Sequence, residues 1–216
     1  MFQSSVRSSL VVLATLVGAQ WVAAVATAAQ PIRTLPAELA EWPVGPVRWL
    51  LQPDELRAFS ALETREAAMA FIRSFWQRRD PTPEDAVNPF ADAFSERVTM
   101  ADQLFSEELV RGALTDRGGA LLLLGSPGAV QILRRRVSVG KLGRATRAAD
   151  GTLHTQEVEI ERWRYPREAV VLALPGRDLP ETIELEFVRR PRAVVWSSGK
   201  AWAERAGRAA LREPLP

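Results

Sequence analysis

Two charged pairs are the residues of this sequence with the clearest chemical potential. Arg79 and Asp80 stand side by side just before Pro81, and Asp116 and Arg117 stand side by side before two glycines. A planar guanidinium can donate two parallel hydrogen bonds to a carboxylate, so arginine–aspartate contacts could cross-link the two turns. Two carboxylates could instead serve as the acid and the base of a hydrolase.

A structural role is the simplest interpretation of both pairs. Thr115 precedes Asp116, and an aspartate in such a position often accepts a hydrogen bond from a backbone amide of its own turn. The alternative is a binding cleft for a peptide, a glycan or an anion between the two turns. Catalysis is the less favoured interpretation, because a sequence cannot show how far apart the carboxylates lie or whether either has a raised pKa. We therefore predict no catalytic residue and six structural or binding residues: Trp76, Arg79, Asp80, Thr115, Asp116 and Arg117.

Other catalytic and metal-binding chemistry has little support in the composition. The chain has no cysteine, which excludes disulfides and thiol chemistry. Its one histidine, His154, has no nucleophile-elbow glycine pattern near it. One histidine without cysteine also disfavours a transition-metal site, and only an all-carboxylate calcium site stays open. We expect no metal and no cofactor.

The length and charge indicate one globular domain that is not built for nucleic acid. The chain has 216 residues, of which 47% are hydrophobic, and a formal net charge of only +2. A nucleic-acid-binding domain would need a larger cationic surplus. Two short arginine-rich runs, residues 134–136 and 189–192, are expected to be solvated surfaces. Contact with anionic lipid or acidic glycan is the alternative for them.

The first 28 residues resemble an export signal. Arg7 lies in a short polar start, an apolar run follows from Leu10 to Val17, and Ala26 and Ala28 supply small residues for cleavage. The alternative is an uncleaved anchor, because the apolar stretch is nearly long enough to span a bilayer. Both interpretations place the protein outside the cytoplasm, in the periplasm or cell envelope.

The next segment, residues 29–46, is predicted to be an extended linker. Its four prolines oppose both a helix and a central strand. Trp42 and Trp49 flank the end of this linker and are expected to fix it to the folded body through apolar contacts.

Three helices are predicted in the first half of the chain. The first starts near Pro53, and the second runs from Arg65 toward Asp80, where the following proline disfavours further helix. The third starts at Asn88, a capping residue followed by proline. Apolar residues recur at helical spacing in all three.

The second half is predicted to be mainly strands. Residues 120–124 form an apolar run between glycine turns, typical of a buried strand. Further strands are expected near residues 130–139, 155–165, 169–174, 182–188 and 193–196, with a loop over 140–151 and a short helix over 201–211. Val158 and Ile160 alternate out of phase with Trp163 and Tyr165, which predicts either a bulge or a strand covered on both faces. Helices followed by strands predict an α+β fold, with about three N-terminal helices packed on a mainly antiparallel sheet.

Spaced residues between positions 47 and 166 form a pattern that no single piece of it would make specific: Trp49, Leu50, Glu55, Phe59, Leu62, Glu66, Phe71, Phe75, Trp76, Arg79–Pro83, Asn88, Phe90, Arg97, Ala101, Phe105, Gly112, Thr115–Gly118, Gly125, Pro127, Trp163 and Tyr165. This combination resembles the GWxTD domain of exported bacterial proteins. One position departs from the family pattern: Ala113 stands where the motif has tryptophan. We expect a GWxTD-like α+β domain over 47–198 and a C-terminal tail over 199–216.

This resemblance implies an exported envelope protein of a bacterium of the Gram-negative type, without assigning a reaction. The expected function is therefore a non-enzymatic binding module whose partner is an envelope protein or a cell-surface polymer. Two alternatives stay open: a hydrolase that acts on an envelope polymer through carboxylates, and a peripheral membrane protein held by its N-terminus and arginine runs.

Overall fold

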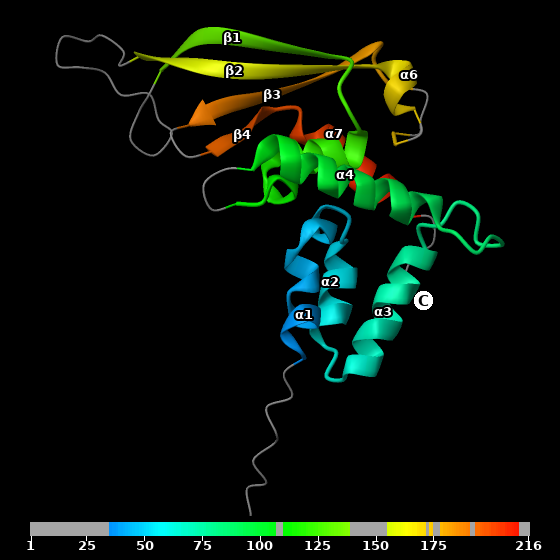
Figure 1. The fold of residues 1–216 in the computed structure, drawn as a ribbon. Coiled ribbons are helices and arrows are strands. Elements are labelled where there is room, and N and C mark those ends of the chain that lie inside the picture. The colour runs from blue at the N-terminus through cyan, green and yellow to red at the C-terminus, as the bar shows by residue number, and fades with distance from the viewer. Residues whose placement is uncertain are drawn as a thin grey trace, which may run out of the picture. The chain divides into compact units, whose positions relative to one another are not determined.

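The computed structural model describes residues 35–106, 110–138, 155–171, 173–174, 178–190 and 193–211. All of them belong to one compact unit, Arg33–Pro216. The predicted export signal, the start of the predicted linker, His154 and the loop over 140–151 lie outside the described residues. The predicted α+β class is confirmed, because helices come first and a four-stranded antiparallel sheet follows (Figure 1).

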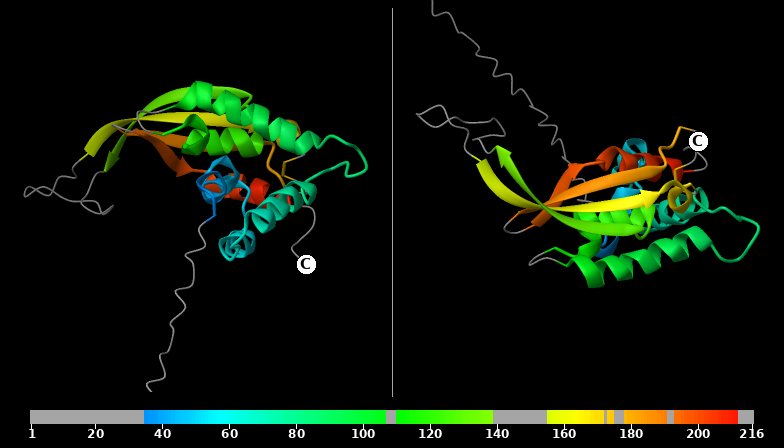
Figure 2. Two further views of the ribbon diagram at one scale, coloured as in Figure 1. Left: turned by 60° about the horizontal axis from the view of Figure 1, so that its bottom comes forward. Right: turned by 90° about the horizontal axis from the view of Figure 1, so that it is seen from above.

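The sheet is an antiparallel meander in the order β1-β2-β3-β4. Helices α4 (Pro89–Phe105), α5 (Asp116–Leu124) and α7 (Lys200–Ala209) lie on one face of it. Helices α1 (Ala37–Ala40), α2 (Pro53–Ser60) and α3 (Arg65–Gln77) lie beyond these three, on the side away from the sheet (Figures 1 and 2). The main apolar core fills the space between the sheet and these helices. The strands are β1 (Ala129–Ser138), β2 (Thr155–Pro166), β3 (Thr182–Arg190) and β4 (Ala193–Ser198).

The predicted helices are confirmed together with their start signals. The Asn88 side chain accepts a hydrogen bond from the Ala91 amide at 3.0 Å, with Pro89 in the first helical position. Gln52 and Glu55 cap the first helix reciprocally. These helices are α2 (Pro53–Ser60), α3 (Arg65–Gln77), α4 (Pro89–Phe105) and the C-terminal α7 (Lys200–Ala209).

The prediction of an extended linker is wrong for its described part. The chain forms short helical turns there instead: α1 (Ala37–Ala40), η1 (Trp42–Val44) and η2 (Pro46–Trp49). Prolines occupy first-turn positions of η1 and η2, where no amide hydrogen is needed, so they start helical turns rather than prevent them.

The expected fixing role of the two tryptophans is confirmed. The Trp42 ring lies 5.1 Å from the Phe59 ring and 5.0 Å from the Phe75 ring, centre to centre. The Trp49 indole donates a hydrogen bond to the Ala113 carbonyl at 2.8 Å. The turns before α2 are therefore attached both to the helical layer and to the segment before α5.

The prediction of a strand at residues 120–124 is wrong, because this run forms the second half of helix α5 (Asp116–Leu124). All residues from Gly118 to Leu124 are buried, so the helix has no polar face that would reveal a helical period. The start signal was present in Thr115, whose hydroxyl accepts a hydrogen bond from the Gly118 amide at 3.0 Å.

The strand predicted at 169–174 is also wrong. Residues Arg167–Val170 form the short helix α6, directly after β2 ends at Pro166. The strands β2 and β3 are already neighbours in the sheet, so no strand fits between them. The buried side chains of Val170 and Leu174, which suggested a strand, belong to the main core instead.

Strand β2 carries apolar side chains on both faces without a bulge. Its register with β1 runs unbroken from Thr155 to Arg164. Trp163 and Tyr165 join the main core, whereas Val158 and Ile160 join a second cluster with Val188. Since successive side chains of a strand point to opposite faces, the second of the two predicted alternatives is confirmed.

Two backbone segments approach closely at Gly112, the first residue of the turn η3 (Gly112–Leu114). A Cβ at this position would lie 1.8 Å from the carbonyl oxygen of Ala101 in α4. Only glycine therefore allows η3 to pack against α4 at this distance.

We predict that Gly112→Ala lowers the free energy of unfolding by at least about 1–3 kcal/mol, because the backbone must move apart. Thermal unfolding measures this effect. Gly45→Ala is the milder control, since its Cβ would meet its nearest neighbour at 3.2 Å. An unchanged melting temperature for Gly112→Ala would contradict the close approach.

Candidate functional site

A buried cluster of one carboxylate and two guanidinium groups joins α2 to the end of α3. The Arg79 Nη2 donates to Glu55 Oε2 at 2.6 Å, and its Nη1 donates to Oε1 at 2.9 Å. Arg78 Nη2 donates to Glu55 Oε1 at 2.8 Å. The side chains of Glu55 and Arg79 are 0% exposed and that of Arg78 is 7% exposed.

Backbone groups and an aromatic ring complete this cluster. Arg79 also donates to the carbonyls of Phe75 and Leu50, at 3.0 and 3.1 Å, and its guanidinium lies 3.7 Å from the centre of the Phe75 ring. The Gln52 amide donates to Glu55. Desolvation of buried charges is costly, and these bonds offset that cost.

The pKa of Glu55 reflects the balance of burial and pairing. Burial by itself raises this pKa, but hydrogen bonds from Arg79, Arg78 and the Gln52 amide outweigh burial. The pKa therefore lies below its ordinary value. Burial lowers the pKa of Arg79, and the hydrogen bond to Glu55 opposes that change. The carboxylate form is thus the one that the folded protein stabilises.

The predicted pairing of arginine with Asp80 is wrong. The neighbouring Arg79 points to Glu55, and Asp80 Oδ1 accepts a hydrogen bond from the Thr82 amide at 3.0 Å. Asp80 therefore forms an aspartate turn after α3.

The Thr115–Asp116 pair links α5 to the sheet. Thr115 caps the start of α5, and its hydroxyl donates to the Gly112 carbonyl at 2.7 Å. Asp116 Oδ2 accepts a hydrogen bond from the Trp196 amide of β4 at 2.8 Å. Asp116 therefore bonds a backbone amide, as its structural interpretation requires, although the amide belongs to a distant strand rather than to its own turn.

Arg117 makes the second arginine–glutamate contact between distant segments. Its Nη1 lies 3.0 Å from Glu161 Oε2 in β2, and its guanidinium lies 4.8 Å from the Phe105 ring centre in α4. The other oxygen of Glu161 accepts a hydrogen bond from the Trp163 indole at 2.7 Å. This contact ties α4, α5 and β2 together.

The suggested cross-link between the two turns is not formed, because Asp80 bonds the Thr82 amide and Asp116 bonds the Trp196 amide. The sequence analysis did not identify the two glutamates that pair with these arginines, Glu55 with Arg79 and Glu161 with Arg117. A signal existed for each: Glu55 lies one helical turn before Phe59, on the buried face, and Glu161 shares the inward parity of Trp163.

An open groove lies beside Trp76, between the second half of α3 and the loop that leads to α4. Its volume is about 680 Å³. We call it the Trp76 groove. It is lined by Arg73, Ser74, Trp76, Gln77, Arg78, Asp80, Pro83, Asp85, Ala86 and Asn88.

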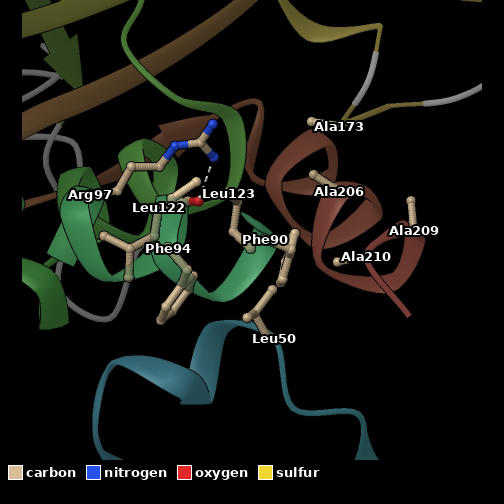
Figure 3. Close-up of a pocket in the computed structure, with 11 residues that line it drawn as sticks. Leu50, Phe90, Phe94, Arg97, Leu122, Leu123, Ala173, Ala206, Ala209 and Ala210 are labelled. Carbon is tan, nitrogen blue, oxygen red and sulfur yellow. Dashed lines mark hydrogen bonds between the residues drawn. The ribbon is translucent and has the colours of Figure 1, made fainter. Parts of the chain in front are cut away.

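A smaller pocket of about 190 Å³ opens between α4, α5 and α7 (Figure 3). We call it the Arg97 pocket, because Arg97 is its one charged lining residue. The other lining residues are apolar: Leu50, Phe90, Ala93, Phe94, Leu122, Leu123, Ala173, Ala206, Ala209 and Ala210.

Two carboxyl groups of the described residues differ from the general acid of a hydrolase, which needs a raised pKa. The pKa of Glu55 is lowered, and so is that of Asp102: its burial raises the pKa, but bonds from Arg111 and the Ala113 amide outweigh it. Within the described part of the chain, no three His, Cys, Asp or Glu side chains converge as metal ligands would.

Position 113 belongs to the interior of this chain. Ala113 is 0% exposed, its carbonyl accepts the Trp49 indole hydrogen, and its amide donates to Asp102 Oδ1 at 2.9 Å. It therefore cannot form part of a recognition surface here.

The chain matches no known protein-family model, no curated protein and no solved structure. Among the helices that the structure describes, none is both long and apolar enough to cross a bilayer.

We predict that Glu55→Gln destabilises the protein by about 3–5 kcal/mol, because two buried guanidinium groups lose their counter-charge. Denaturant unfolding measures this loss. Glu66→Gln, an exposed glutamate on α3, is the control and should be close to neutral. A loss below about 1 kcal/mol for Glu55→Gln would show that the cluster contributes little.

The wild-type protein and Glu55→Gln should also differ in how the free energy of unfolding changes at acid pH. The folded-state pKa of Glu55 lies below the ordinary value of 4.5, so its contribution is complete above that pH and is lost as the pH falls through the folded pKa. Glu55→Gln should lose this part of the acid dependence, which unfolding curves at several pH values would reveal.

Replacing Asp116 by alanine is expected to cost about 1–3 kcal/mol, because the Trp196 amide loses its acceptor. Asp116→Asn should retain part of this stability, since an amide oxygen can still accept. Thermal unfolding compares the two variants. Equal melting temperatures for wild type and Asp116→Ala would argue against the bond to β4.

Proposed function

We propose that this protein is a non-enzymatic, exported binding module of the GWxTD type. Its partner would be an envelope protein or a cell-surface polymer. The observation that carries this proposal is the Trp76 groove, an open and chemically mixed concavity whose walls are fixed by hydrogen bonds.

Both walls of the groove are held in place before any ligand arrives. Asn88 donates to the Trp76 carbonyl at 2.9 Å, so the end of the loop is tied to α3. The Asp80 side chain and the Thr82 carbonyl bond amides within the loop. Arg78 is held by Glu55 from beneath. A preformed site loses less conformational entropy on binding, which favours affinity.

The lining favours a polar, extended ligand with some apolar surface. Arg73 offers an exposed cationic group, Asp80 and Asp85 offer anionic ones, and Trp76 adds an aromatic side chain. A peptide segment that carries both signs of charge complements such a surface, and electrostatic complementarity gives specificity and fast association. We therefore favour an envelope protein over an uncharged polymer.

The two alternatives have less support. For a hydrolase, Asp80 and Asp85 both line the groove, but Asp80 already accepts the Thr82 amide. For a peripheral membrane protein, the arginine runs are partly neutralised: Arg135 lies 3.5 Å from Glu186 and Arg189 lies 2.8 Å from Glu159. An anionic surface would compete with these glutamates.

The proposal is tested by reversing charge inside the groove. Arg73 and Asp85 are exposed, and their side chains form no hydrogen bond or ion pair with another described residue, so Arg73→Glu and Asp85→Lys should leave the melting temperature unchanged. Each should reduce capture of the partner from a native envelope extract at least about fivefold, because like charges would face the ligand. Quantitative pull-down with mass spectrometry measures the capture.

Arg57→Glu is the control matched to Arg73→Glu. It makes the same charge change on the exposed surface of α2, outside the groove. It should capture the partner as wild type does. If all three variants capture the same proteins equally, the groove is not the binding site. Release of sugar or peptide products by the purified protein would favour the hydrolase instead.

A further inference from the structure

Arg97 differs from the other arginines that are buried or half-buried between packed elements. Arg79 pairs with Glu55, and Arg117 pairs with Glu161. The Arg97 Nη1 donates a hydrogen bond to the Leu122 carbonyl at 3.0 Å. Among the described residues, no carboxylate pairs with Arg97. The Leu122 carbonyl lies in the last turn of α5, where the helix dipole has its negative end. This end corresponds to only about half an elementary charge, so it compensates the positive charge of Arg97 in part.

The pKa of Arg97 is lowered, as expected for a half-buried cation without a carboxylate partner. Burial lowers this pKa, and the only opposing influence is the nearby Tyr165. Tyr165 does not neutralise Arg97, because burial raises the pKa of the phenol well above its ordinary value. Its hydroxyl also donates to the Gly125 carbonyl at 3.1 Å. An anion beside Arg97 would supply the missing charge.

The Arg97 pocket places this guanidinium beside an apolar chamber. Figure 3 shows Arg97 at one side of the pocket, with Ala206 and Ala209 of α7 and the following Ala210 at the opposite side. Small side chains on α7 leave the space open, and Phe90 and Leu123 contribute larger apolar walls. One cationic side chain among otherwise apolar side chains, with polar backbone atoms also exposed to the space, describes a site for an amphipathic anion.

We propose that the Arg97 pocket binds a small carboxylic acid of about six carbon atoms. The length follows from the size of a cavity that holds a benzene-sized group, about 150 Å³. The carboxylate of this acid would pair with the free edge of the Arg97 guanidinium, and its tail would lie between α4 and α7. The pocket volume of about 190 Å³ suits this size. This site is separate from the Trp76 groove, and the two lining sets share no residue.

The probe for this proposal is hexanoate, titrated into the full chain by calorimetry, with thermal unfolding as a second readout. Hexanoate should bind at one site and raise the melting temperature with concentration. Acetate has the charge without the tail, and hexanol has the tail without the charge. Both should bind at least about tenfold more weakly, because each loses one of the two interactions.

Two variants address the two ends of the pocket independently. Arg97→Gln removes the charge and should weaken hexanoate about tenfold or more without improving hexanol. Ala209→Leu fills the pocket from a half-buried position on α7 and should abolish binding of hexanoate. Ala201→Leu, on an exposed part of the same helix outside the lining, is the matched control and should bind normally.

Each outcome decides the proposal. If hexanoate does not bind the wild-type chain, or if hexanol binds equally well, the proposal is wrong. If Arg97→Gln fails to fold, Ala209→Leu and Ala201→Leu still distinguish pocket binding from attachment elsewhere. Loss of binding in Ala209→Leu but not in Ala201→Leu supports the proposal, and equal binding by the two overturns it.

Discussion

The buried contact between Glu55 and Arg79 constrains the N-terminal half of this protein. One carboxylate receives two guanidinium groups and a backbone amide, while Arg79 closes on the carbonyls of Leu50 and Phe75. The start of α2, the end of α3 and the turn before α2 thus converge on two side chains. Arg78 connects this cluster to the Trp76 groove, because it donates a hydrogen bond to Glu55 and also lines the groove.

Arginine has three different roles in this fold, which the surroundings of each guanidinium determine. Arg79 and Arg117 cross-link distant elements through glutamates, and the planar guanidinium suits such contacts. Arg135 and Arg189 form exposed pairs on the sheet, which contribute little stability. Arg97 is half-buried without an acid, and this difference makes its pocket chemically distinctive.

Local signals in the sequence predicted the amphipathic helices well. The Asn88 cap and the apolar stripe of α4 are properties of one segment, so periodicity and capping rules suffice to locate it. The leucine run of α5 was mistaken for a strand because a helix buried on every side has no polar face. The partners of Arg79 and Arg117 could not be chosen from sequence, because many acids compete and only tertiary packing selects Glu55 and Glu161.

The outer strand β1 affects how readily copies of this protein aggregate. Among the described strands β1 pairs with β2 alone, and Val130 and Ile132 on this outer strand are each 53% exposed. An apolar strand with unpaired backbone groups invites another chain to add to the sheet. The arginines at 134–136 follow directly on the same strand and are exposed. Their mutual repulsion across two approaching copies makes them gatekeepers against aggregation.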